Sequence, residues 1–229
     1  MDPLNIIKII AALITVVIAL IAGFMELRLN PKFWLNRWFF IFFISTSLGF
    51  LIYTLYHLIP LITMNEQIIT PLAITAQIFF NFIPVSLVMT VFILEDYKKV
   101  AMDFSHLGIM IIVFITMSFG YFIWSPTLDK IDYIKSIVDT TTPRGWFIFV
   151  NILRIALFIY VIIKYALMAR KVEEDTKKRI YWFFVGVFLV IVGLIVNLLG
   201  GLFEFIILEI LALIALNIGI LIITKGFLS

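Results

Sequence analysis

The segment from Ile180 to Thr224 reads IYWFFVGVFLVIVGLIVNLLGGLFEFIILEILALIALNIGILIIT, and its charged residues are Glu204 and Glu209 alone. One helix needs about 20 apolar residues to cross the hydrocarbon of a bilayer, so this segment is long enough for two crossings. Apolar runs of this length are typical of membrane-spanning helices. The segment therefore predicts two transmembrane helices, at about 180–200 and 202–224.

The remainder of the chain has the same character. The 229 residues are 64% hydrophobic and 14% charged, whereas a soluble domain has about 25% charged residues. The alternating pattern of a transmembrane β-barrel is absent, so helices must satisfy the backbone hydrogen bonds. We expect an all-α, single-domain, seven-helix transmembrane bundle over 1–229 in the cell membrane, with its other helices at about 5–24, 38–61, 69–94, 104–124 and 146–168.

Lysine and arginine residues concentrate in alternate loops. The loops after the first, third and fifth predicted helices hold most of them, including Lys98-Lys99 and several residues of 170–179. Because cytoplasmic loops carry an excess of these residues, we expect the N-terminus outside and the C-terminus in the cytoplasm. The first apolar run is not expected to be a signal peptide, since Asp2 precedes it and no basic residue comes before Lys8.

The composition excludes several kinds of chemistry. The chain has no cysteine, and its two histidines, His57 and His106, fall near opposite ends of the predicted bundle. We therefore expect no metal and no cofactor. A retinal Schiff base needs a lysine in the middle of the last helix, and the lysine there is Lys225 at its end. The net charge of +3 fits basic loops that face anionic headgroups, so nucleic acid is not expected as a partner.

Polar residues inside the apolar runs are the candidates for function, because a charge near the membrane centre costs about 2.5–3.5 kcal/mol on insertion scales. Arg154 falls roughly 12 Å below the outer boundary and Glu209 at nearly the same depth, so we expect an ion pair between them. Together, the polar residues of the outer halves of the helices predict a ligand-binding pocket open to the outside. These residues are Tyr53, His57, Gln77, Asn81, Asn151, Arg154, Asn197, Glu204 and Glu209. The alternative is that these groups satisfy one another as interhelical hydrogen bonds.

The longest predicted loop, 125–145, is expected on the outside. Ser125-Pro126 is typical of a helix N-cap and first turn, and the apolar residues Leu128, Ile131, Ile134 and Val138 recur at helical spacing. This pattern predicts an amphipathic helix on the outer membrane surface, which Thr140–Pro143 would end. A lid over the pocket is the alternative.

The sixth predicted helix carries small residues along one side. Gly186, Gly193, Asn197 and Gly200 fall on a single helical face. Small residues allow another helix to approach closely in a membrane. We expect this face to be a packing surface, with Asn197 either bridging helices or facing a cavity.

Two other classes of function are open besides a receptor. Pro71 and Pro84 interrupt the third predicted helix, and broken helices mark binding sites in transporters, so a small transporter or channel is one alternative. A structural subunit of a membrane assembly is the other. Catalysis is not expected, because the nearest acidic group, Glu95-Asp96 with Asp103, is also typical of an ordinary loop.

The order of these features resembles the N-terminal seven-transmembrane sensor module of archaeal and bacterial histidine kinases. The matching segments are the turn from Pro31 to Trp38, the stretch from Pro84 to Phe92, Gly145-Trp146 and the charged loop from Arg170 to Arg179. The resemblance implies that the outer side senses a stimulus and that the last helix passes a change to an effector. Only residues 225–229 follow that helix, so we expect either a relative that signals through a separate partner or a part of a longer chain.

These observations predict a non-catalytic receptor or sensor-like module. Its lipid-facing helices contact the bilayer, and a small-molecule ligand is expected to enter from the outside. A separate signalling partner is expected to bind the cytoplasmic loops at 95–103 and 169–179.

Overall fold

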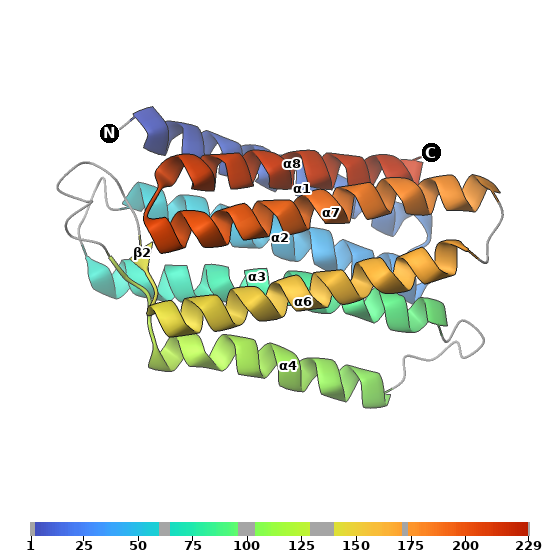
Figure 1. Cartoon of the computed structure of the whole chain (residues 1–229), viewed down its shortest axis with the longest axis horizontal. Coiled ribbons are helices and arrows are strands. Elements are labelled where there is room, and N and C mark those ends of the chain that lie inside the picture. Colours follow the sequence, from blue (N-terminus) through green and yellow to red (C-terminus); the bar gives the residue numbers. More distant parts are fainter. Residues whose placement is uncertain (1–2, 60–64, 96–103, 129–139, 171–173, 229) are drawn as a thin grey trace.

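The computed structural model describes residues 3–59, 65–95, 104–128, 140–170 and 174–228. It contains seven helices that are long and apolar enough to cross a membrane, which confirms the all-α, seven-helix prediction. The helices are α1 (Pro3–Leu29), α2 (Trp34–Leu58), α3 (Glu66–Glu95), α4 (Phe104–Ile123), α6 (Arg144–Ala169), α7 (Glu174–Phe203) and α8 (Ile206–Leu228). They lie roughly parallel to the long axis of the molecule (Figure 1).

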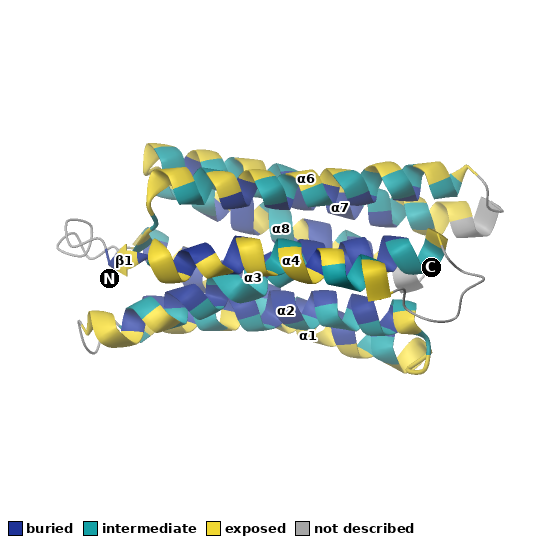
Figure 2. Cartoon of the chain, turned by 90° about the horizontal axis from the view of Figure 1, so that it is seen from below, coloured by how far each residue is buried: buried dark blue, intermediate teal, exposed yellow. Residues whose placement is uncertain are grey.

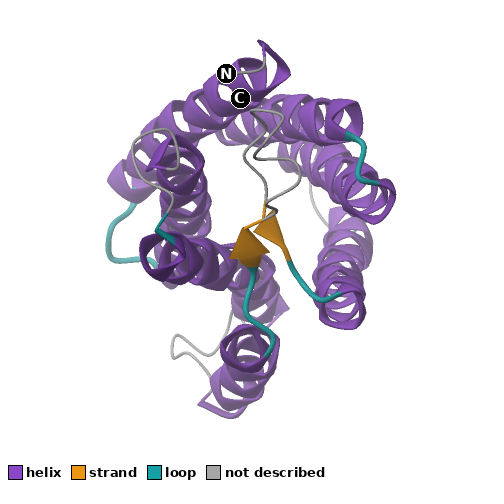
Figure 3. Cartoon of the chain, turned by 90° about the vertical axis from the view of Figure 1, so that its left-hand side faces the viewer, coloured by secondary structure: helices purple, strands orange, loops and turns teal. Residues whose placement is uncertain are grey.

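The helices are arranged as a ring with one helix outside it. Successive packing contacts join α1 to α2, α2 to α3, α3 to α6, α6 to α7, α7 to α8 and α8 back to α1. We call these helices the ring. Helix α4 packs mainly on α3 and lies outside the ring (Figure 3). The end of the bundle where α1 begins is called the N-terminal end below.

The helices have a buried side that faces the rest of the bundle and an exposed side that faces outward, as expected for a bundle in lipid. Much of the outward surface of α4 and α6 is exposed (Figure 2). On these surfaces the exposed side chains include large apolar ones such as Ile112, Phe119 and Ile163. In the half remote from the N-terminal end, a core of aromatic and aliphatic residues that includes Phe39, Phe43 and Phe183 fills the ring. Buried polar side chains occur in both halves, with Lys8, His57 and Arg154 toward the N-terminal end and Glu26, Asn36 and Thr90 toward the other end.

The seam between α7 and α8 is set by glycines. A Cβ added to Gly186 would lie 2.7 Å from the carbonyl oxygen of Gly219, and one added to Gly219 would lie 2.8 Å from that of Gly186. Gly193 and Gly200 also face α8, against Ala212 and Glu209. The predicted packing face of small residues is confirmed, because only hydrogen in these places lets the two backbones approach so closely.

The turn between α7 and α8 differs from the predicted one. We expected a break near residue 201, but α7 continues through Gly200 and Gly201 to Phe203. Glu204 then adopts a left-handed conformation with φ 55°, and the amide of Phe205 donates to the carbonyl of Gly200 at 2.9 Å. This is a Schellman motif with glutamate at the position that usually holds glycine. It ends α7 without a glycine at the turn itself.

The predicted helix start at Ser125-Pro126 is wrong. Thr127–Leu128 forms strand β1, which pairs antiparallel with β2, Thr140–Thr141. The threonines are β-branched and favour extended backbone, and Leu128 packs beside Tyr56 and Ile69. The strands lie at the N-terminal end of the bundle (Figures 1 and 3). The other apolar positions of the predicted amphipathic helix, Ile131, Ile134 and Val138, lie outside the described residues.

Candidate functional site

A cavity of about 120 Å³ lies inside the ring. Side chains of α2, α3, α6, α7 and α8 line it. Its polar lining consists largely of residues that the sequence predicted for the pocket: Tyr53, Gln77, Arg154, Asn197 and Glu209. The rest of the wall is mainly aromatic and aliphatic, with Phe50, Phe80, Phe158 and Leu194 among its members. The structure thus brings residues from helices far apart in the sequence to one partly polar cavity.

Arg154 of α6 is the buried cation of this cavity, with 5% of its surface exposed. Its Nε and Nη2 donate to Oδ1 of Asn81 at 2.9 and 2.7 Å. Its Nη2 also donates to Oε1 of Gln77 at 2.8 Å. Both acceptors belong to α3 and are neutral amides. The Arg154 guanidinium is therefore held in place without a carboxylate among its described partners.

The amide acceptors of Arg154 are themselves oriented by α4. Asn81 donates through Nδ2 to the carbonyl of Met117 at 2.9 Å and to Oγ of Ser118 at 3.2 Å. The hydroxyl of Tyr121 donates to Oε1 of Gln77 at 3.2 Å. Donors from α4 fix the orientation of both amides so that their oxygens face the guanidinium. Asn81 does not line the cavity, but it positions a residue that does.

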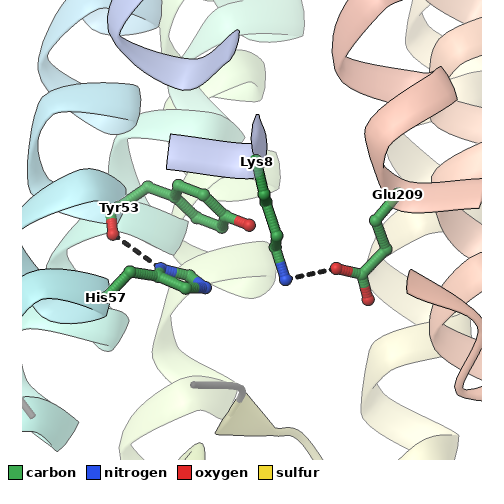
Figure 4. Close-up of polar contacts among 4 residues, drawn as sticks. All are labelled: Lys8, Tyr53, His57 and Glu209. Atoms are coloured by element: carbon green, nitrogen blue, oxygen red, sulfur yellow. Dashed lines mark hydrogen bonds and ion pairs between the residues drawn. The ribbon is translucent and has the colours of Figure 1, made fainter. Parts of the chain in front are cut away.

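The predicted ion pair between Arg154 and Glu209 is wrong. Glu209 pairs with Lys8 of α1, which is 1% exposed (Figure 4). The reason lies in the order of the ring, since α8 packs on α1 whereas α6 packs on α7. Arg154 and Glu209 line the same cavity from separate helices without forming a salt bridge.

Lys8 is a site residue that the sequence analysis missed. It is the only charged residue within the apolar run of α1 before Glu26, and that isolation was a usable signal. A lysine near the start of a membrane helix can also place its amine at the interface, so the position alone does not predict an inward-facing amine. The structure instead turns its amine inward, 5.8 Å from the centre of the Tyr53 ring.

His57 lies beside this ion pair but does not line the cavity. Its side chain is fully buried, and Nδ1 donates to the carbonyl of Tyr53 at 2.8 Å (Figure 4). The imidazole also lies against the Tyr53 ring, with centroids 4.0 Å apart. Its Nε2 has no hydrogen-bond partner among the described residues. His57 and Tyr53 thus form a polar aromatic wall on the α2 side of Lys8.

Besides Asn81 and His57, two further residues of the predicted pocket do not line the cavity. Glu204 sits at the turn after α7, where its side chain is 67% exposed and pairs with Arg144 at 3.3 Å. It lies at the surface because the left-handed turn carries it out of the helix. Asn151 is buried and donates to the carbonyl of Phe147 in its own helix at 2.9 Å. Neither side chain lines the cavity.

Metal coordination has no support within the part of the chain that the structure describes. No group of three histidine, cysteine, aspartate or glutamate side chains comes together there. The polar groups that line the cavity are instead the hydroxyls of Thr46 and Tyr53, the amides of Gln77 and Asn197, the Arg154 guanidinium and the Glu209 carboxylate. This set is suited to binding an organic molecule by hydrogen bonds and charge.

Comparison with known proteins gives no family model, no curated protein and no solved structure that matches the chain. The class of protein therefore follows from the structure. Seven membrane-spanning helices define a multi-pass membrane protein whose helical surface contacts the lipid bilayer. Its ring encloses a cavity with a buried cation.

Proposed function

We propose that this protein is a non-catalytic membrane receptor or sensor-like module that binds a small molecule in the ring cavity and signals through a separate partner. The observation that carries the proposal is the cavity itself, about 120 Å³, to which five helices contribute side chains. Ligand sites are commonly concave and mostly apolar with a few convergent polar groups. This cavity has both characteristics.

Helix α7 offers a route from the cavity to a partner. Asn197 lines the cavity near one end of α7, and the same uninterrupted helix begins at Glu174, within the segment 169–179 that was predicted as a loop. The glycine seam holds α7 against α8, which contributes Glu209 to the cavity. A ligand that moved Asn197 or Glu209 would therefore shift the α7–α8 pair as one body. The proposed partner would detect that shift at the loop end of α7.

Transport is the weaker alternative. The prolines that suggested a broken helix, Pro71 and Pro84, lie within α3, which continues from Glu66 to Glu95 as a single helix. Discontinuous helices at a transporter's binding site expose backbone groups to the substrate, and α3 does not have this form. Of the acidic group considered for catalysis, Glu95 pairs with Lys164 at 2.6 Å, and Asp96 and Asp103 lie outside the described residues.

The experiment is a screen of benzene-sized molecules for thermal stabilisation of the protein in lipid nanodiscs. Leu194→Trp should abolish every genuine hit, because Leu194 lines the cavity and the larger ring would fill it. The matched control is Leu199→Trp, at a residue of the same helix that is 40% exposed. Hits that survive Leu194→Trp would contradict the proposal. Accumulation of a hit inside proteoliposomes would favour transport instead.

A further inference from the structure

We infer that the ligand of the ring cavity is a small monocarboxylate with an apolar body no larger than a phenyl ring. This inference rests on the proposed function, because it names the chemical class of the molecule that the cavity would bind. It is argued from the charge of the cavity, from its unused hydrogen-bonding groups and from its size.

The charges around the cavity leave a positive excess. Lys8 and Glu209 form an ion pair and compensate each other. Arg154 lines the cavity, and its described partners are neutral groups: the amides of Asn81 and Gln77 and the hydroxyl of Tyr121. A buried charge without a counter-ion is unfavourable, and an anion in the cavity would supply one. A neutral or cationic ligand would leave that charge uncompensated.

Unused donors point to an oxygen anion. The hydrogen bonds of Arg154 to Asn81 and Gln77 leave from Nε and Nη2, and none of them leaves from Nη1. Asn197 also lines the cavity, and its side-chain amide makes no hydrogen bond to any described residue. A carboxylate has two acceptor oxygens and can accept from both groups. Hydrogen bonds between ionised partners are about twice as strong as neutral ones.

The size and the walls of the cavity limit the remainder of the ligand. Its volume is about 120 Å³, which is below the volume of an apolar cavity of about 150 Å³ that binds benzene in another protein, so a phenyl ring is the upper limit for the apolar body. Phe50, Phe80 and Phe158 provide aromatic wall surface, which favours offset or edge contacts with a second ring. A long acyl chain exceeds this volume. The carboxylate therefore belongs to a small, water-soluble acid and not to a fatty acid from the bilayer.

The test is calorimetric titration of the protein in nanodiscs of phosphatidylcholine with benzoate, benzamide and laurate. We expect saturable binding of benzoate and no binding of laurate. The isosteric neutral benzamide should bind at least about tenfold more weakly than benzoate, because a charge-assisted hydrogen bond is lost. Asn197→Leu should weaken benzoate binding while leaving the melting temperature nearly unchanged, because Asn197 makes no hydrogen bond to the described protein. Arg154→Met should abolish it, and Arg144→Gln, on the exposed part of the same helix, should have no effect.

The outcomes separate the inference from the proposed function. If benzamide binds as tightly as benzoate and Leu194→Trp blocks both, the cavity binds a ligand but the anionic class is wrong. If laurate binds and benzoate does not, the small size is wrong. If neither the acids nor the amide binds, and the fragment screen also gives no hit that Leu194→Trp blocks, the proposed function fails together with the inference. If Arg154→Met does not fold, the effect of Asn197→Leu on benzoate binding tests the inference.

Discussion

Arg154 on α6 donates twice to one oxygen atom, Oδ1 of Asn81 on α3. The nitrogen of the same amide donates to the carbonyl of Met117 on α4. One asparagine side chain therefore connects the buried cation of the cavity, the third helix and the helix that lies outside the ring. The amide cannot rotate without losing both sets of bonds, so the contact to α4 fixes the orientation of the acceptor that holds Arg154.

Asn81→Leu should lower the free energy of unfolding by about 2–3 kcal/mol, because it leaves a buried charge without its main acceptor. Thermal unfolding in detergent measures the effect. Asn197→Leu is the control, since it makes the same change at a residue without hydrogen bonds to the described protein, and its melting temperature should stay within about 2 °C of the original. Equal losses in the two variants would contradict the role assigned to Asn81.

Lys8→Met and Glu209→Gln should each destabilise the protein by about 3–5 kcal/mol, because each removes one member of a buried ion pair. The double variant should recover part of this loss, which a double-mutant cycle measures as a coupling energy. The exposed pair of Arg144 and Glu204 is the comparison, with an expected coupling of about 0–1 kcal/mol. Strictly additive effects of the Lys8 and Glu209 changes would show that the pair does not form.

Gly186→Ala should separate α7 from α8, because the added carbon would lie 2.7 Å from the backbone oxygen of Gly219. We expect a loss of about 1–3 kcal/mol, measured by thermal unfolding. Gly108→Ala in α4 is the matched control, since an added Cβ there meets no atom within 4 Å. It should be neutral or stabilising by up to about 1 kcal/mol. A tolerated Gly186→Ala would disprove the close seam.

Single cysteines at Thr141 and Lys178 test the predicted orientation, because the chain has no cysteine of its own. Both side chains are exposed, one in β2 and the other in the first turns of α7. If the N-terminus is outside, an impermeant thiol reagent added to intact cells should label Thr141→Cys only. Labelling of Lys178→Cys alone would reverse the orientation and place the β strands in the cytoplasm.

The sequence predicted the number and approximate limits of the membrane-spanning helices because lipid imposes one length and one polarity on them. It also placed Arg154 and Glu209 at similar depths, since depth follows from counting residues along a helix. It could not identify their partners, because partners depend on which helices are neighbours around the ring. The pairing of Lys8 with Glu209 required the contact of α1 with α8, which no local pattern encodes.

Local geometry explains the remaining differences. Glu204 was expected in the pocket, but its left-handed backbone ends α7 and turns its side chain to the surface. The short pairing of β1 with β2 was hidden because two-residue strands have no period. Helical spacing in the same loop therefore favoured the wrong structure at its start.

The ion pair between α1 and α8 also imposes an order on biosynthesis. A ribosome completes α1 long before it reaches α8, so Lys8 enters the bilayer before its carboxylate partner has been translated. Until then, water or headgroups at the membrane surface must solvate the amine, which the long lysine stem permits. Insertion of α8 then supplies both Glu209 and the part of the cavity wall that Ala212 and Leu213 form. A nascent chain without this last helix thus has neither the complete cavity wall nor the carboxylate that pairs with Lys8.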